Sequence, residues 1–137
     1  MASREVAVRF PATMSGLANG GESLRAFLDG VELDSTRRYK VELTFDEIAG
    51  NIVRHGQPVN SVELVVAIDD DEAVMTFDDD GVAFDPRTHE DRRQPAPIEH
   101  AQIGGLGLVL VRNCASRIEY ERTAEQHNRL TLAIPLR

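Results

Sequence analysis

Residues 34–77 contain one long amphipathic segment, followed by two short segments with strand-like composition. The first segment predicts a helix that is capped by Asp34 or Ser35, runs to His55 and ends at Gly56. Residues 62–68 and 73–77 flank four consecutive acidic residues, and they predict an antiparallel hairpin. The apolar stripe of the helix recurs at helical spacing: Val41, Phe45, Ile48, Ile52 and Val53.

The remaining segments extend this pattern without an internal repeat or a change of composition. They predict a strand over 5–10, a helix over 14–28 that three glycines weaken, a long loop over 85–102, a helix over 107–116, and strands over 117–121 and 130–136. Antiparallel strand pairs with helices between them indicate an α+β two-layer sandwich. We therefore expect a single domain over 1–137, with a mainly antiparallel sheet covered by helices on one face.

Composition narrows the class of protein. The 137 residues include 15 basic and 23 acidic side chains, giving a net charge of −8 and a single cysteine, Cys114. The acidic balance argues against a general nucleic-acid binder, and one cysteine excludes an internal disulfide. No segment approaches the ~20 apolar residues of a membrane span, and the N-terminus lacks the apolar core of a signal peptide. These features predict a soluble, cytoplasmic protein.

Glu47 and Asn51 are the first candidate functional pair. They lie four residues apart on the predicted helix 35–55, so both project from one face. An amide oxygen is a suitable ligand for magnesium, and a nearby carboxylate can accept a proton. The alternative is a solvated glutamate and an asparagine that caps the helix, with His55 as a C-terminal residue that the helix dipole favours.

A run of acids, Asp78-Asp79-Asp80, is followed by Gly81 after the predicted strand 73–77. A carboxylate at the end of a strand can accept a hydrogen bond from an adenine amino group, and a glycine lets the backbone approach the base. The alternatives are a turn or a calcium loop, but the calcium-loop spacing is not met.

A glycine-rich stretch, Gly104-Gly105-Leu106-Gly107, opens the predicted helix 107–116. Free N–H groups at a helix N-terminus suit phosphate. The stretch matches neither a Walker sequence nor a Rossmann turn. The alternative is a glycine hinge that packs a helix tightly.

In this order, the three segments resemble the asparagine box and the two glycine boxes of the GHKL (Bergerat-fold, HATPase_c) ATP-binding superfamily. The shared pattern is Glu-x-x-x-Asn on a long helix, Asp-x-Gly after a strand and Gly-x-Gly before a helix. The short length, the ending Asn-x-x-x-His-Gly and the motif Asp-x-Gly-x-x-Phe-Asp-Pro are most similar to the anti-sigma factor serine/threonine protein kinases.

The resemblance implies a role for each matching residue. Asn51 would coordinate Mg²⁺ on the phosphates of ATP, Glu47 would be the general base, and Asp79 would bind the adenine amino group beside Gly81. Residues 86–103 would form an ATP lid, from which Arg92 and Arg93 either reach the phosphates or remain solvated. The cradle for the phosphates would consist of Gly104, Gly105, Leu106 and Gly107.

The implied activity is phosphorylation of a Ser or Thr on an anti-anti-sigma (STAS-domain) partner, in a cycle that also binds a sigma factor. Family members commonly act as homodimers. One alternative is a nucleotide-gated binding module with weak or no kinase activity. A histidine kinase is disfavoured because 137 residues leave no room for a dimerisation helix pair with an acceptor histidine. In a protein that binds no nucleotide, the glycines would be structural.

Three positions depart from the family pattern. Gly50 stands where many members carry threonine or another small residue, and Ala83 replaces a second glycine. Asn128 stands about where many relatives have Gly-Thr before the last strand. A threonine contact with the nucleotide is therefore in doubt at both Gly50 and Asn128.

Overall fold

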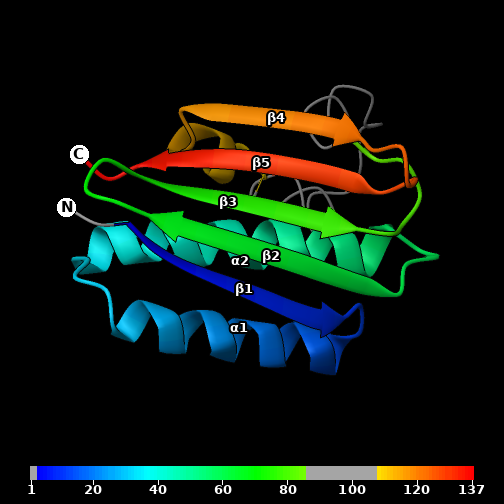
Figure 1. Ribbon diagram of the computed structural model, residues 1–137, viewed down its shortest axis with the longest axis horizontal. Helices are drawn as coiled ribbons and strands as arrows, with labels where there is room; N and C mark the ends of the chain where they lie inside the picture. The colour runs from blue at the N-terminus through cyan, green and yellow to red at the C-terminus, as the bar shows by residue number, and fades with distance from the viewer. Residues whose placement is uncertain (1–2, 86–107) are drawn as a thin grey trace, which may run out of the picture.

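The computed structural model describes residues 3–85 and 108–137, and Figure 1 shows their arrangement. A further helix occupies residues 108–114. The helices and strands labelled in Figure 1 are, in chain order, β1 (Arg4–Pro11), α1 (Met14–Asp29), α2 (Ser35–His55), β2 (Ser61–Ile68), β3 (Glu72–Asp79), β4 (Arg117–Arg122) and β5 (Asn128–Pro135). In the described part of the chain, no helix is long and apolar enough to cross a membrane.

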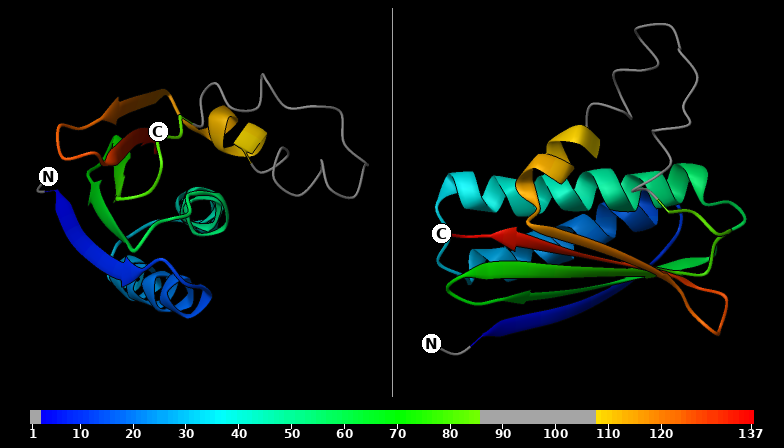
Figure 2. Two further views of the ribbon diagram at one scale, coloured as in Figure 1. Left: turned by 90° about the vertical axis from the view of Figure 1, so that its right-hand side faces the viewer. Right: turned by 90° about the horizontal axis from the view of Figure 1, so that it is seen from above.

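The five strands form one sheet in the order β1-β2-β3-β5-β4, and every neighbouring pair is antiparallel. Figure 2 shows α1 and α2 on the same face of this sheet, so the domain has two layers. The core lies between them, because alternate residues of β2 and β3 are buried towards the helices. The predicted α+β two-layer sandwich is confirmed.

The glycines of α1 allow this helix to lie close to the edge of the sheet. A Cβ added at Gly20 would come within 2.6 Å of the ring of Phe10 on β1. A Cβ at Gly16 would meet the carbonyl oxygen of Pro11 at 2.0 Å. Glycine lowers helix propensity, but here it removes side chains that would hold the two layers apart.

Helix α2 spans the domain, and its N-cap is Asp34, whose side chain accepts a hydrogen bond from the Arg37 amide at 2.8 Å. This N-cap satisfies one of the free N–H groups of the first turn. The apolar face of α2 packs on α1 and the sheet, with Phe45 meeting Phe10 edge to face at 5.9 Å between ring centroids. The two ends of α2 therefore lie over opposite ends of the sheet.

The sequence prediction ended the third strand too early and started the last strand too late. Asp78 and Asp79 belong to β3, where Asp79 lies opposite Val62 on one side and Asn128 on the other. Acidic residues are poor strand formers, but Asp78 is paired with His127 and Arg129 of the neighbouring segment. These tertiary partners explain why the strand continues past Phe77.

Candidate functional site

Three polar residues from distant parts of the sequence meet beside the last turns of α2. Asn51 comes from α2, Asp79 from the end of β3 and Asn128 from the start of β5. They border a small cavity of about 20 Å³, which holds roughly one water molecule. The other residues around it are mostly apolar: Ile48, Ile52, Phe84, Tyr120 and Leu130. Of the residues at this border, Phe84 and Tyr120 are partly exposed, so a larger ligand would enter by displacing them.

Asn51 is buried, and its side chain has no hydrogen-bond partner in the described part of the chain. The residue is 5% exposed. Buried side-chain amides are normally hydrogen-bonded, and an unpaired one costs about 1–3 kcal/mol. An unsatisfied amide beside a cavity is what a metal ion, a water molecule or a ligand would complete.

One carboxylate oxygen of Asp79 is hydrogen-bonded, and the other has no hydrogen-bond partner among the described residues. Its Oδ1 accepts hydrogen bonds from the Gly81 amide at 2.9 Å and from Asn128 Nδ2 at 3.0 Å. Its Oδ2 accepts none from the described residues. Burial raises the pKa of this carboxyl above its ordinary value, while the hydrogen bonds from Asn128 and Gly81 oppose the rise. A buried carboxylate with one open oxygen is suited to accept a hydrogen bond from a ligand.

Gly81 stands at a close approach between two turns of the backbone. A Cβ added there would lie 2.4 Å from the carbonyl oxygen of Gly56, the residue that ends α2. That carbonyl accepts a hydrogen bond from the Val82 amide at 3.2 Å, and Arg122 donates to the Gly81 carbonyl at 2.8 Å. Gly81 therefore joins the end of β3 to the end of α2, which holds Asp79 near Asn51.

Glu47 lies one turn before Asn51 on α2 and is partly exposed. Desolvation raises the pKa of its carboxyl, the positive charge of Arg54 lowers it, and Asp46 raises it further. A raised pKa brings a carboxylate closer to the range in which it can accept a proton during a reaction. The guanidinium of Arg54 lies over Gly50, where an added Cβ would meet its nitrogens at 3.0 Å. A side chain at position 50 would therefore displace Arg54.

The sequence marks Asn128 only as a departure from a family pattern and gives no signal for Tyr120. In the structure, Asn128 binds Asp79 directly, and Tyr120 donates to Asn128 Oδ1 at 2.5 Å. No local pattern identifies either residue, because their contacts depend on the register between β4 and β5. The cross-strand pairing of Tyr120 with Leu130 sets that register.

Several predicted residues lie outside the described part of the chain. They are Arg92, Arg93, Gly104, Gly105, Leu106 and Gly107, together with the whole proposed lid, residues 86–103. Of the predicted site residues, Glu47, Asn51, Asp79 and Gly81 lie in the described part of the chain. Asn51 and Asp79 line the small cavity, whereas Glu47 and Gly81 are not among its lining residues.

Asn51 is the described residue best suited to hold a metal ion. Its side-chain oxygen is a hard donor, and its amide has no partner among the described residues. Within residues 3–85 and 108–137, no group of three His, Cys, Asp or Glu side chains forms a metal cluster. Magnesium commonly binds through one or two protein ligands together with substrate phosphates, and this donor set fits that mode.

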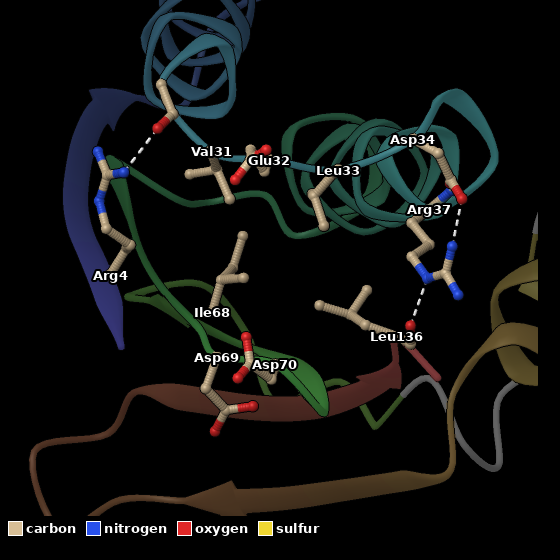
Figure 3. Close-up of a pocket in the computed structure, with 11 residues that line it drawn as sticks. Arg4, Val31, Glu32, Leu33, Asp34, Arg37, Ile68, Asp69, Asp70 and Leu136 are labelled. Atoms are coloured by element: carbon tan, nitrogen blue, oxygen red, sulfur yellow. Dashed lines mark hydrogen bonds and ion pairs between the residues drawn. The ribbon is translucent and has the colours of Figure 1, made fainter. Parts of the chain in front are cut away.

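A larger cavity lies at the opposite end of the sheet. Figure 3 shows the residues that line it. Its volume is about 640 Å³, within the range of ligand pockets. However, its two arginines are already bound, Arg4 to the Gly30 carbonyl and Arg37 to Asp34 and the Leu136 carbonyl. Four acidic side chains also line it: Glu32, Asp34, Asp69 and Asp70. This excess of negative charge disfavours a polyphosphate, despite the greater volume.

A search of curated proteins gives no significant match. A family model described as histidine kinase-like ATPase domain matches residues 10–134. The match covers almost the whole chain and includes Glu47, Asn51, Asp79 and Asn128. All the residues that line the small cavity beside α2 lie within the matched region. The chain therefore belongs to the histidine kinase-like ATPase family of ATP-binding domains.

Proposed function

We propose that this protein is an anti-sigma factor serine/threonine protein kinase. It binds Mg²⁺-ATP in the site between α2 and the ends of β3 and β5, and it phosphorylates a Ser or Thr of a STAS-domain antagonist. The single observation that carries the proposal is the buried amide of Asn51, which has no partner among the described residues and lines the cavity that Asp79 also borders. Family membership supports ATP as the ligand, and the motifs Asn-x-x-x-His-Gly and Asp-x-Gly-x-x-Phe-Asp-Pro favour this branch.

Different residues bind different parts of the nucleotide. The open Oδ2 of Asp79 accepts the amino hydrogen of adenine, and the apolar side chains of Ile48, Ile52 and Leu130 contact the base. The side-chain oxygen of Asn51 would hold the metal, and residues 104–107 would bind the phosphates. When bound, magnesium neutralises charge on the phosphate oxygens.

The transfer step requires one proton acceptor. The hydroxyl oxygen of the partner's Ser or Thr attacks the γ-phosphorus, while the bond from that phosphorus to the β–γ bridging oxygen breaks and ADP leaves. The hydroxyl proton passes to the Glu47 carboxylate, one helical turn from Asn51. Phosphoryl transfer depends mainly on positioning and on charge stabilisation, so a modest base is sufficient.

The wider proposal is a partner-switching cycle. This protein holds a sigma factor inactive until the unphosphorylated antagonist displaces it, and phosphorylation then releases the antagonist. We include a homodimer in the proposal, which light scattering of the purified protein tests.

The test is incubation of the protein with γ-labelled ATP, magnesium and a purified STAS-domain protein of the same organism. We expect acid-stable label on the partner and none on a partner whose acceptor Ser or Thr is replaced by alanine. Acid-labile label would indicate phosphohistidine instead. Nucleotide binding without any transfer would contradict the kinase and support a nucleotide-gated binding module.

A further inference from the structure

Asn128 uses the full hydrogen-bonding capacity of its side chain. Its Nδ2 donates to Asp79 Oδ1 at 3.0 Å and to the Val82 carbonyl at 2.8 Å. Its Oδ1 accepts from the Phe84 amide at 3.1 Å and from the Tyr120 hydroxyl at 2.5 Å. An amide has two donor hydrogens and two acceptor lone pairs, so nothing is left over.

These partners leave the amide only one orientation. If the Asn128 amide were turned over, its oxygen would face the Asp79 carboxylate and the Val82 carbonyl, which are both acceptors. The side chain is also 5% exposed, so water would not relieve the mismatch. Asn128 therefore presents a fixed N–H donor to Asp79.

This donor determines which part of the Asp79 carboxylate remains available. With Asn128 and Gly81 both bound to Oδ1, the carboxylate is held in one orientation, and Oδ2 is the oxygen without a partner in the described part of the chain. An amino group at the 6-position of a purine matches such an acceptor. A purine without that group leaves a buried carboxylate oxygen unpaired, which carries a penalty.

We propose that Asn128 is the positioning residue for base selectivity: by fixing the Asp79 carboxylate, it makes the site prefer a 6-aminopurine nucleotide. This role rests on the proposed nucleotide site. Asn128 of β5 also links three other segments, because its side chain is hydrogen-bonded to Asp79 of β3, to the chain at residues 82–84 and to Tyr120 of β4. Asn51, in contrast, has no hydrogen-bond partner among the described residues and would hold the metal.

The first experiment compares the affinities of ATP and purine riboside triphosphate, which has hydrogen in place of the amino group. The wild-type protein should prefer ATP by about 10- to 100-fold, the value of one hydrogen bond to a charged group. Asn128→Ala should reduce this ratio to within about 3-fold of unity. The ratio is independent of the fraction of folded protein, so a less stable variant still gives a valid result.

Arg129→Gln is the matched control. Arg129 is the next residue of β5, but its side chain binds Asp78 on the other face of the sheet. This variant should keep the wild-type preference for ATP. A preference that survives in Asn128→Ala, or that is lost equally in Arg129→Gln, overturns the proposed role.

The pH profile of Asn128→Asp supplies a second readout. Two carboxyl groups about 3 Å apart cannot both ionise cheaply, so at low pH the pair keeps one proton that restores a donor to Asp79. ATP affinity of this variant should fall as the pH rises from about 5 to 8 and the pair loses that proton. The wild-type affinity should stay level or rise over this range. Parallel profiles would contradict the proposal.

These outcomes separate the role of Asn128 from the proposed function. If the wild-type protein binds neither nucleotide, the nucleotide site and the role of Asn128 both fail. If it binds ATP selectively and Asn128→Ala is equally selective, the role of Asn128 fails while the nucleotide site stands.

Discussion

The two ends of the sheet contain cavities of opposite character. The cavity bordered by Arg4, Ile68 and Leu136 is about 640 Å³, whereas the one bordered by Asn51 and Asp79 is about 20 Å³. At the large cavity the polar groups lie at an exposed rim, and the arginines are bound to the protein itself. At the small cavity, a buried amide and a buried carboxylate oxygen lack partners among the described residues.

This difference shows that volume alone is a poor guide to function. Exposed polar groups are solvated at little cost, but a buried and unpaired polar group lowers stability unless a ligand completes it. The fold therefore includes this unfavourable free energy near the C-terminal end of α2, at Asn51 and Asp79. Near the N-terminal end of α2, the polar groups are solvated or already paired. The four predictions below test this contrast, beginning with the largest expected effect.

Glu47→Gln tests whether the helix carries a base at the Asn51 end. We expect phosphoryl transfer to fall by about 100- to 10,000-fold, the usual contribution of a general base, because glutamine cannot accept the proton. Nucleotide affinity should change by less than about 3-fold. The measurement is single-turnover transfer from labelled ATP. Glu42→Gln, which alters an acid nearer the other end of α2, serves as the control, and an undiminished rate in Glu47→Gln would remove Glu47 as the base.

Asn51→Ala tests the unpaired amide. We expect affinity for Mg²⁺-ATP to fall by about 10- to 100-fold, while thermal stability stays within about 2 °C or rises, because no hydrogen bond is lost. Titration calorimetry and thermal unfolding measure the two effects. Asn60→Ala is the matched control: Asn60 donates to Asp80 at 3.0 Å, so that variant should lose some stability but no affinity. Equal affinity of Asn51→Ala and the wild-type protein would contradict the site.

Asp79→Asn tests the buried carboxylate. The amide keeps an acceptor oxygen for Gly81 and Asn128 but places a donor where Oδ2 was, so ATP affinity should fall by about 10-fold or more. At pH 7 the variant should unfold about 3 °C above the wild-type protein, because it no longer buries a charge.

The pH dependence of stability has a defined sign. Since burial raises the pKa of Asp79, the folded protein holds this proton more tightly than the unfolded chain. The wild-type free energy of unfolding therefore falls as the pH rises from the ordinary value, 3.8, through the raised pKa. The advantage of Asp79→Asn over the wild-type protein should shrink below that range. An advantage that grows at low pH would contradict the assigned pKa direction.

Arg37→Gln gives the smallest effect and concerns the large cavity. Arg37 joins the start of α2 to the Leu136 carbonyl and to Asp34, so the variant should lose about 1–2 kcal/mol of stability. ATP affinity should stay within about 2-fold of wild type. Denaturant unfolding and calorimetry provide the measurements. A clear loss of ATP affinity in the folded variant would indicate that the two ends are not functionally separate.

Much of the fold was predictable because its signals are local. The stripe from Val41 to Val53 and the acidic turn between β2 and β3 each depend on nearby residues. The tolerance of glycine in the confirmed helix α1 and the continuation of β3 through Asp78 depend instead on residues distant in sequence. Gly20 is explained by Phe10, and Asp78 by His127 and Arg129, which are contacts made only in the folded protein.

The same distinction between local and long-range signals applies to the candidate site. Glu47, Asn51 and Asp79 could be selected from short motifs, since one helix or one strand end presents each of them. Asn128 and Tyr120 could not, because they reach Asp79 through the pairing of β5 with β3 and β4. Motifs therefore locate the groups that would touch the nucleotide, and strand register decides which residues hold those groups in place.

The most direct test is a crystal structure of the protein with magnesium and a non-hydrolysable ATP analogue. We predict that the adenine amino group donates to Asp79 Oδ2 and that the metal binds the side-chain oxygen of Asn51. An analogue seated in the cavity beside Arg4 and Leu136, or the absence of any nucleotide beside Asn51 at saturating concentration, would contradict the account.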